Sequence, residues 1–373
     1  MTAKYTVRVL NTVDDIGKEP IDAISNDPFF TYGWLKTLET SKPLKSVPLY
    51  VTVYYENRLV AFLPCFIDLA GHYFLFGPFF PLMERILDVT RKLDIYQDHV
   101  LMCYSPFCYR SKILFGRHFD RELILSLLSR KIDEICREQR FLFTSFNFVS
   151  GFDSFLMANL QDCGYYQIPW RITLYLDVQW STFEEYVSSL PYKSRRTVRR
   201  EIKKCKERGV EIAEEPNFGE LSEKLPVLYS NLYKKYNTGS KSPFDSSFFK
   251  ALSKYAKDKA KLFVAKKAGE IVGFSLLVRH KNVLDAFIVG FEYDSFQSNT
   301  DFAYFNLSYE SIKWAIKERI KRINYRFTAE EAKLRRGCSQ EQIFSFVKCH
   351  NKFLNLFYNT YIRQKYRKIY KQL

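Results

Sequence analysis

The sequence lacks an uninterrupted apolar run of the roughly 20 residues that a membrane-spanning helix requires, because Asp, Arg or Lys interrupts each hydrophobic segment. Its first residues, MTAKYTVRVLNTVDD, lack the apolar stretch and the small-residue cleavage site of a secretory signal. We therefore expect a cytoplasmic protein, and the inner face of the membrane is the alternative location.

The eight cysteines lack the spacing of a metal site or of a redox motif. No Cys-x-x-Cys occurs, and the close pair Cys103 and Cys108 has no histidine at ligand spacing. Cys349 and His350 are adjacent, but adjacent residues on a helix point in different directions. We expect buried, reduced thiols, no metal site and no tightly bound cofactor.

Apolar residues, in contrast, are abundant. They make up 47% of the 373 residues, with 34 Phe and 26 Tyr. A chain of this length exceeds what one hydrophobic core usually organises, so two domains are expected.

Two stretches of the chain repeat one plan. Residues 49–67 and 261–279 each alternate apolar and polar positions around a turn, Glu56-Asn57 in the first and Gly269-Glu270 in the second. This pattern is typical of a half-buried β-hairpin. An amphipathic helix follows each hairpin, at 120–138 and at 305–321, and Asp120 is a suitable N-cap for the first. The repeat predicts a duplicated α/β unit with a ligand-binding groove between the copies.

The other segments predict a mixed order of strands and helices. Strands are expected at 5–10, 73–76, 141–148, 170–178, 283–290 and 322–327, and helices at 31–40, 152–162, 182–208, 218–236, 245–257 and from 340 onward.

Positive charge is a strong compositional signal, with a formal net charge of +16. Such a surface attracts phosphates on nucleotides, nucleic acids or anionic lipids. The charge is concentrated in residues 192–209, which predict a helix that ends at Gly209. An apolar seam of Val198, Ile202 and Cys205 lies beside two basic rows. The rows are Arg195, Arg199 and Lys203, and Arg196, Arg200 and Lys204.

This basic helix has two interpretations. Its cations form either a solvated surface or a phosphate-binding face, and the planar fork of arginine suits bidentate phosphate contact. The C-terminal tail, residues 361–371, interleaves five cations with Tyr361, Tyr366 and Tyr370. Aromatic rings among cations suit either a membrane interface or stacked bases.

The order of elements, together with the segments at 28–39, 190–212 and 309–337, resembles the acyltransferases of the GNAT superfamily that carry a duplicated fold. Within that superfamily, the sequence resembles the FemAB-like enzymes and the peptidoglycan biosynthesis/recognition family. The resemblance implies an α/β (α+β) protein with two tandem GNAT-like domains, residues 1–165 and 166–373, each a mixed, mostly antiparallel sheet flanked by helices. The second domain would carry the basic helix 192–209 and the basic aromatic tail.

The resemblance also implies site residues. Phe29 and Trp34 match the opening helix beside the acceptor groove, although ordinary core packing is the alternative for each aromatic ring. Arginines at two places match the donor-binding helix and the segment beyond the last core strand: Arg195, Arg196, Arg199, Arg200, Arg335 and Arg336. Lys333 matches the lysine just beyond that strand.

One segment departs from the GNAT pattern. Acetyl-CoA-dependent members bind the pyrophosphate in a glycine-rich turn, because backbone N–H groups bind phosphate only where side chains stay out of the way. Here the corresponding residues, 293–300, are YDSFQSNT and contain no glycine. A bulky donor held by arginines fits better, and the candidates are acyl-CoA, acyl-ACP and aminoacyl-tRNA.

The implied chemistry is attack of an amine on a thioester or ester carbonyl, which needs alignment, a proton acceptor and a donor to the oxyanion. The candidate proton acceptors are Glu292, Asp301 and Glu310. Lys333 is the candidate for the oxyanion or for a donor phosphate, and Tyr304 or Tyr309 for returning a proton to the leaving group.

Two further functions fit the same residues. A nucleic-acid-binding module without chemistry fits the net charge and the arginine rows. Lipid N-acylation at an anionic membrane surface fits the tail. The duplicated hairpin and helix units favour the enzyme.

Overall fold

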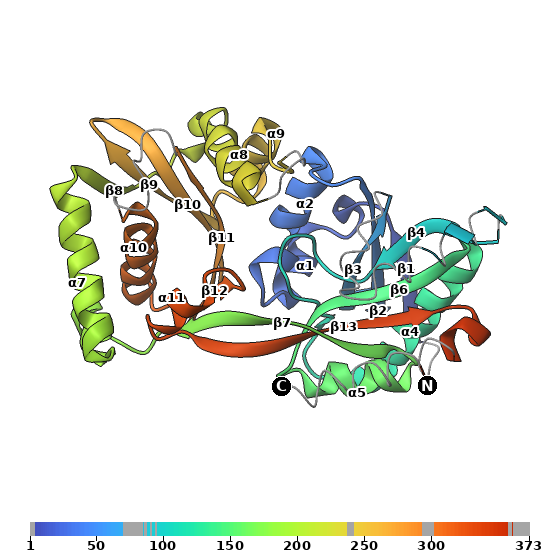
Figure 1. Ribbon diagram of the computed structural model, residues 1–373. Coiled ribbons are helices and arrows are strands. Elements are labelled where there is room, and N and C mark those ends of the chain that lie inside the picture. Colours follow the sequence, from blue (N-terminus) through green and yellow to red (C-terminus); the bar gives the residue numbers. More distant parts are fainter. Residues whose placement is uncertain are drawn as a thin grey trace. The chain divides into compact units, whose positions relative to one another are not determined.

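The computed structural model describes residues 4–69, 85, 88–89, 92–93, 95–236, 242–292, 302–356 and 360. The chain divides into two compact units, whose elements are labelled in Figure 1. Unit 1 comprises residues 1–24, 44–171 and 342–373, and unit 2 comprises residues 25–43 and 172–341. In each unit, helices flank a mixed sheet, so the predicted α/β (α+β) class is confirmed.

This division differs from the predicted boundary between residues 165 and 166 in three segments, 25–43, 166–171 and 342–373. Residues 25–43 belong to unit 2, because helix α2 (Tyr32–Ser41) packs against α9 (Ser246–Tyr255). The approach is close enough that a Cβ on Gly33 would lie 2.3 Å from the carbonyl oxygen of Tyr255. Residues from 342 onward belong to unit 1, because strand β13 (Ser339–Cys349) pairs with β6 (Phe141–Ser150).

The sheet of unit 1 has the strand order β1-β2-β3-β4-β6-β13, with β5 paired to β3. Its further strands are β1 (Tyr5–Leu10), β2 (Ser46–Tyr55), β3 (Arg58–Asp68), β4 (Gln97–Met102), β5 (Leu114–Phe115) and the first part of β7 (Tyr166–Asp177). The helices are α1 (Lys18–Ile24), α4 (Arg121–Glu138) and α5 (Ser154–Asp162), with a 3-10 turn, η2 (Val13–Asp15), before α1.

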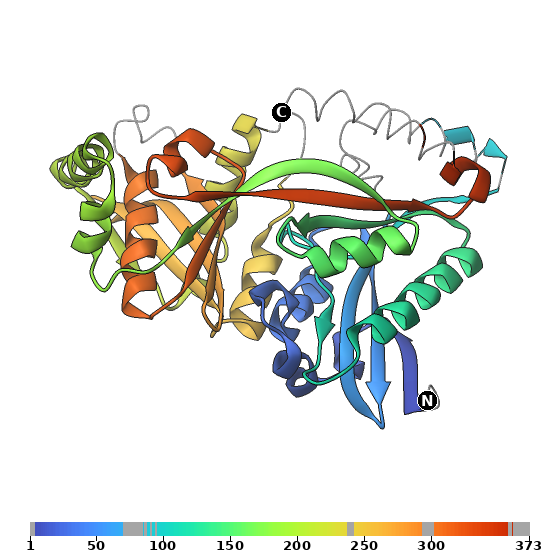
Figure 2. The same ribbon diagram turned by 90° about the horizontal axis from the view of Figure 1, so that it is seen from below.

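Helix α4 supplies much of the core of unit 1. Asp120 caps it as predicted, because its Oδ1 accepts a hydrogen bond from the Leu123 N–H at 3.0 Å. Ile124, Leu128 and Ile132 are buried against the sheet, on which α4 lies in Figure 2. This is the helix that the amphipathic pattern predicts.

The sheet of unit 2 has the strand order β7-β12-β11-β10-β9-β8. Its strands, besides β7, are β8 (Val210–Glu214), β9 (Ala260–Lys267), β10 (Glu270–His280), β11 (Val283–Phe291) and β12 (Arg322–Arg326). Its further helices are α6 (Phe183–Ser189), α7 (Tyr192–Glu207), α8 (Lys224–Tyr236), α10 (Ala303–Lys317) and α11 (Glu330–Leu334), with 3-10 turns η3 (Pro28–Phe30) and η5 (Phe218–Leu221).

Helices cover both faces of this second sheet. Helix α10 packs on β8, β9 and β10, and α8 packs on β10 and β11 (Figure 1). The contact with α8 depends on Gly290, where a Cβ would lie 2.7 Å from backbone atoms of Leu228 and Tyr229. Helices α10 and α8 therefore bury the two faces of the sheet of unit 2.

Both predicted hairpins are present. Strands β2 and β3 turn at Glu56-Asn57, and both residues have positive φ, at 47° and 66°. Strands β9 and β10 turn at Ala268 and Gly269, one residue earlier than predicted, because Lys267 pairs with Glu270.

Two predicted helices are wrong. The helix expected at 182–208 is broken into α6 and α7, since Pro191 has no N–H to donate and disfavours helical backbone at Leu190, where ψ is 153°. The helix expected from 340 onward is instead strand β13, because its residues pair with β6 in antiparallel register. The predicted strand 73–76 lies outside the described residues.

Candidate functional site

Strands β11 and β12 of unit 2 part after a short parallel pairing. They pair at only three positions, from Val283 with Arg322 to Asp285 with Asn324. Strand β11 then continues through residues 286–291, still paired with β10 as far as Phe291. Helix α10 begins at Ala303, beyond the end of β11, and α11 follows the end of β12. Side chains from β12, α10 and α11 therefore meet where the two strands part.

Lys333, on α11, is the most informative of these side chains. It is 8% exposed, and its ammonium donates hydrogen bonds to the carbonyl oxygen of Tyr325 at 2.6 Å and to Oγ1 of Thr328 at 3.4 Å. Burial lowers the pKa of Lys333 to about 8; Arg326 adds to this shift and Cys338 opposes it. The third N–H of the ammonium has no acceptor among the described residues, so it is free to donate to a ligand.

Two tyrosines lie around these strand ends. The hydroxyl of Tyr325 accepts a hydrogen bond from Oγ of Ser308 at 3.3 Å, and burial raises its pKa, with Cys338 and Tyr304 contributing in the same direction. The Tyr304 ring meets the Phe291 ring edge-on at 6.3 Å. Of the predicted residues, Lys333 therefore lies beside the end of β12 and Tyr304 beside the end of β11.

A buried ion pair that the sequence interpretation missed lies at the same place. Asp285 is fully buried, and its Oδ1 accepts from the guanidinium of Arg326 at 3.2 Å. That guanidinium also lies over the rings of Phe29 and Phe287, at 5.6 and 5.0 Å. The available signal was a lone aspartate in the apolar strand VLDAFIVGF, since a buried carboxylate requires a partner and Arg326 ends the adjacent strand.

Phe29 and Trp34, predicted to line the acceptor groove, are fully buried. Their rings meet edge-on at 4.6 Å, and Trp34 meets Phe287 at 5.1 Å and Phe248 at 6.1 Å. They belong to the aromatic core of unit 2, which was the alternative interpretation. Phe29 contacts the site through Arg326, whose guanidinium lies over its ring.

A second buried cluster ties α7 to α10 and α11. Arg336 donates to both carboxylate oxygens of Glu201, at 2.8 and 2.7 Å, and to the hydroxyl of Tyr309 at 2.8 Å. Tyr309 in turn donates to Glu201, and the Arg336 guanidinium lies 3.7 Å from the centre of the Phe305 ring. The sequence interpretation missed Glu201, which lies one position from the predicted seam residue Ile202.

This cluster does not fit the roles predicted for Arg336 and Tyr309. Arg336 is 9% exposed, and its donors already bond Glu201, Tyr309 and the carbonyl oxygen of Ala332. Burial raises the pKa of Tyr309, which is bonded on both sides. Both residues hold the helices together, and neither presents a free group to a donor.

The outer face of α7 carries the remaining arginines. Arg196, Arg199 and Arg200 are exposed, and Arg195 is half-buried with its guanidinium donating to the carbonyl oxygen of Ser188 at 3.3 Å. Arg199 forms an exposed ion pair with Glu184. Val198 and Cys205 are buried as predicted, and the N–H of Gly209 bonds the carbonyl oxygen of Lys206 at 3.0 Å just past the helix end.

Arg335 is exposed and pairs with Glu331 one turn earlier on the same segment. This arrangement leaves it at the surface beside the buried Lys333 and Arg336.

The three candidate proton acceptors differ in position. Glu292 is half-buried at the end of β11, and its Oε1 lies 3.5 Å from the side-chain amide of Asn231. Glu310 pairs with Lys313 on the middle of α10. Asp301 lies outside the described residues, as do residues 293–300 and the basic tail at 361–373. Of the two described carboxylates, Glu292 lies at the end of β11, one residue after Phe291, and Glu310 lies on α10.

Within the described ranges, His, Cys, Asp and Glu nowhere gather in a group of three that could hold a metal ion. No described helix is both long and apolar enough to cross a bilayer.

Comparison with known proteins gives a consistent result. A sequence model of the FemAB-like family, described as peptidoglycan biosynthesis/recognition, matches residues 12–373. No curated protein matches the sequence significantly.

Solved structures of the same fold cover nearly the whole chain. FemX superposes with a TM-score of 0.62 at 10% identity, over 94% of this chain and 99% of its own. A conserved protein of unknown function from Bacteroides thetaiotaomicron gives 0.57 at 13% identity, over 92% and 99%. A tandem GNAT protein from the clavulanic acid biosynthesis pathway gives 0.52 at 10% identity, over 93% and 99%. The fold is therefore that of the tandem GNAT proteins, as the resemblance implies.

Proposed function

The chain belongs to the FemAB-like family, and on this premise we propose that it is an N-acyltransferase that moves an acyl or aminoacyl group from an activated donor to an amine. The observation that carries the proposal is the buried Lys333 ammonium beside the point where β11 and β12 part. The tandem GNAT fold supports an acyltransferase-type enzyme.

In the proposed reaction, the acceptor nitrogen attacks the carbonyl carbon of the donor and forms a C–N bond. The carbonyl oxygen becomes an oxyanion. It accepts a hydrogen bond from the third N–H of Lys333, because a fixed cation in a dry site stabilises developing negative charge. The C–O or C–S bond of the donor then breaks. Glu292 accepts the proton that the amine loses, and Tyr304 returns a proton to the leaving oxygen or sulfur.

The donor that fits best bears phosphates. The exposed arginines of α7 offer planar donors for phosphate contact. Arg336, three positions after Lys333, bonds Glu201 of α7 and so connects the segment that carries Lys333 to this helix. Aminoacyl-tRNA, acyl-CoA and acyl-ACP all carry phosphate and remain the candidate donors. The family description makes an amine of a peptidoglycan precursor the first acceptor to test.

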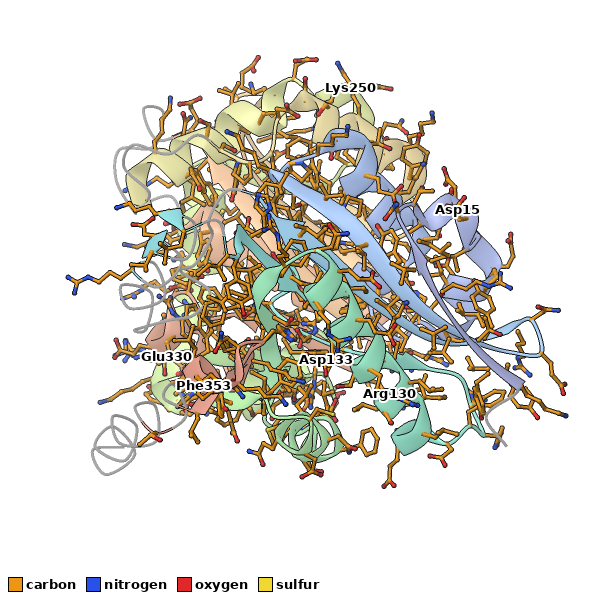
Figure 3. The ribbon with its side chains drawn as sticks, turned by 90° about the vertical axis from the view of Figure 1, so that its right-hand side faces the viewer. Asp15, Arg130, Asp133, Lys250, Glu330 and Phe353 are labelled. Atoms are coloured by element: carbon orange, nitrogen blue, oxygen red, sulfur yellow. The ribbon has the colours of Figure 1, made fainter. Side chains whose placement is uncertain are left out.

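The experiment measures transfer of radiolabelled amino acid or acetyl groups from each donor to an amine-bearing peptidoglycan precursor. Lys333→Met should lower kcat at least about a hundredfold, the typical loss for one oxyanion donor, and change donor binding less than threefold. Lys250→Met is the control, because Lys250 lies exposed on α9 (Figure 3). Transfer by Lys333→Met at the wild-type rate would contradict the proposal.

The rate should also depend on pH. Because the pKa of Lys333 is about 8, the ammonium is lost above that value, and kcat should fall about tenfold per pH unit there. Lys333→Arg should move this decline to higher pH if the charge is what matters.

A nucleic-acid-binding protein without catalysis is the second candidate, favoured by the exposed arginines Arg196, Arg199 and Arg200. It predicts tRNA binding that weakens steeply with salt and no turnover of any donor. Replacing the three arginines with glutamine would lower the salt dependence in both cases, so turnover is what separates the two functions.

A further inference from the structure

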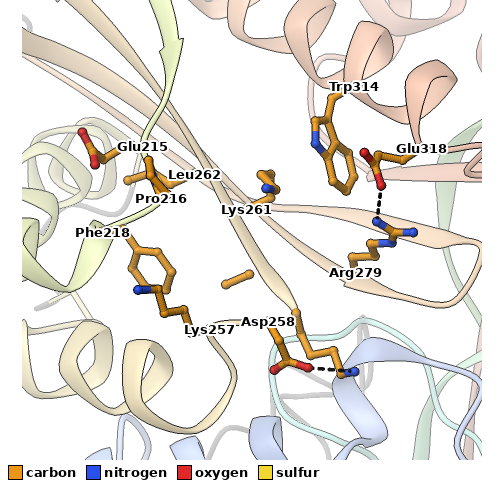
Figure 4. A pocket seen from close by; sticks show the side chains of 12 residues that line it. Glu215, Pro216, Phe218, Lys257, Asp258, Lys261, Leu262, Arg279, Trp314 and Glu318 are labelled. Carbon is orange, nitrogen blue, oxygen red and sulfur yellow. Dashed lines mark hydrogen bonds and ion pairs between the residues drawn. The ribbon is translucent and has the colours of Figure 1, made fainter.

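A cavity of about 500 Å³ lies in unit 2 at the C-terminal end of α10, away from the site described above (Figure 4). Its wall comprises residues after β8, the loop between α9 and β9, the first residues of β9, Arg279 of β10 and the C-terminal end of α10. Trp314 is in this wall, ten residues along α10 from Tyr304, which corresponds to about 15 Å of helix. The cavity and the candidate acyl-transfer site therefore occupy opposite ends of one helix.

Most cations of this wall are already neutralised. Three ion pairs account for them: Lys259 with Asp258 at 3.0 Å, Lys261 with Glu214 at 2.6 Å and Arg279 with Glu318 at 2.9 Å. A simple anion would have to compete with these carboxylates, so the cavity does not behave as a phosphate site.

One cation and one carboxylate of the wall remain. Lys257 and Glu215 have no ion-pair partner within 4.0 Å in the part of the chain that the structure describes. Both form a hydrogen bond with Asn217. The Lys257 ammonium donates to Oδ1 of Asn217 at 3.1 Å, and the backbone N–H of Asn217 donates to Oε1 of Glu215 at 3.3 Å. The two opposite charges therefore bond different groups of Asn217 and do not form an ion pair with each other.

The floor next to these charges is apolar. Phe218 and Leu262 are buried at 1% exposure each. The Trp314 ring is held by two cations, Lys261 at 5.1 Å and Arg279 at 5.2 Å from its centre. Charged groups at one end and a fixed aromatic wall at the other define an orientation for a small amphiphile.

We infer that this cavity binds a free α-amino acid with an apolar side chain. The ammonium and carboxylate of an amino acid are attached to one carbon, so they require adjacent opposite charges, which Glu215 and Lys257 supply. The side chain then lies against Phe218, Leu262 and Trp314. This ligand replaces no existing ion pair, and its binding does not depend on the proposed acyl transfer.

The test measures binding of leucine and phenylalanine to the full-length protein by calorimetry and by saturation-transfer NMR. N-acetyl-leucine lacks the ammonium and leucinamide lacks the carboxylate, so each should bind at least tenfold more weakly than leucine. Absence of saturable binding of both amino acids overturns the inference. Equal binding of N-acetyl-leucine also overturns it, because the cavity would then select only an organic anion.

Two variants connect each charge of the ligand to its residue. Lys257→Gln should remove the preference for leucine over leucinamide, and Glu215→Gln should remove the preference over N-acetyl-leucine. Lys250→Gln, in the middle of α9 and outside the wall, is the matched control and should keep both preferences. If both cavity variants keep both preferences, the site lies elsewhere and the inference fails.

A last measurement separates this cavity from the acyl-transfer site. Lys333→Met should leave leucine binding unchanged, whereas Trp314→Ala should weaken it at least fivefold and reduce the fluorescence change on binding. Loss of leucine binding in Lys333→Met with no loss in Trp314→Ala would place the amino acid at the other end of α10.

Discussion

Each unit contains one parallel strand pair connected through a helix, β4-α4-β6 in unit 1 and β11-α10-β12 in unit 2. In unit 1, β4 stays paired with β6 up to its last residue, Met102, and the N–H of Cys103 continues the pairing with Ser145 at 2.7 Å. In unit 2, β11 runs on through residues 286–291 beyond its last pair with β12. The parallel pair of unit 1 therefore stays hydrogen-bonded to the end of β4, whereas in unit 2 β11 extends beyond its pairing with β12.

The two copies also differ in their buried charges. Near the parting in unit 2 lie Lys333 and the Asp285–Arg326 pair. In unit 1, the polar side chains beside the closed pair satisfy one another: Thr144 bonds His350 at 2.6 Å and Cys136 at 2.9 Å. The two units therefore share one supersecondary plan, and the buried lysine and ion pair described above lie in the unit whose strands part.

The largest expected effect compares the loss of stability when a buried ion pair of unit 2 and a more exposed ion pair of unit 1 are each broken. Arg336→Met leaves the carboxylate of Glu201 buried without its cation and should lower the free energy of unfolding by about 3–5 kcal/mol. Lys348→Met in unit 1 removes the partner of Asp133, which is one-third exposed, and should cost about 1 kcal/mol or less. Guanidinium unfolding of both variants measures the difference, and equal losses would remove the distinction.

The second prediction concerns acid stability and unit 1. Burial lowers the pKa of His350 to about 4 from 6.5, despite the opposing charge of Asp133. The unfolded chain binds the proton first, so stability should fall by about 3 kcal/mol as the pH drops from 6.5 to 4. His350→Gln should flatten this part of the profile. An unchanged acid limb in that variant would assign it to the carboxylates instead.

The third prediction concerns alkaline stability and unit 2. The pKa of Lys333 is about 8 in the folded chain and 10.5 unfolded, so the folded state loses its proton first. Stability should therefore rise, by about 3 kcal/mol, between pH 8 and 10.5, before tyrosine ionisation opposes it. Lys333→Met should remove the rise while keeping His350's acid limb. Thermal melts across pH for both variants show whether the two windows are independent.

The smallest effect compares the two hairpin turns. Glu56 and Ala268 both hold a left-handed backbone, with φ of 47° and 50°, which an L-residue adopts at a cost. Ala268→Asn should stabilise the protein by about 1 kcal/mol or less, because Asn-Gly is the favoured pair for this turn. Glu56→Asn should gain less, because it also removes the exposed ion pair of Glu56 with Lys4 at 2.6 Å. Destabilisation by Ala268→Asn would contradict the prediction, because alanine has no side chain beyond Cβ to lose.

The sequence allowed much of this architecture to be predicted, because hydrophobic period and turn residues are local. Both hairpins, the cap at Asp120 and the end of α7 at Gly209 follow from neighbouring residues alone. The break at Pro191 was also a local signal: it separates the acidic segment at 182–190 from the basic segment that follows.

The errors share a non-local cause. Strand β13 and the buried roles of Glu201, Arg336 and Asp285 depend on partners more than forty positions away. Nothing in the neighbouring sequence distinguishes Glu201 from the charged residues around it, whereas its carboxylate is enclosed by Arg336 and Tyr309. Lys333 was identified through the resemblance, and its burial against Tyr325 and Thr328 depends on the fold around it.

The interleaving of the two units along the chain has a consequence for biosynthesis. Unit 1 acquires β13 only when the ribosome has passed residue 349, and unit 2 takes in residues 25–43 made at the start. Unit 2 is complete once residue 341 has been made, whereas unit 1 still awaits β13. A fragment that ends before β13 would keep unit 2 whole and leave unit 1 without a strand, so unit 1 completes its sheet only after unit 2 has been translated.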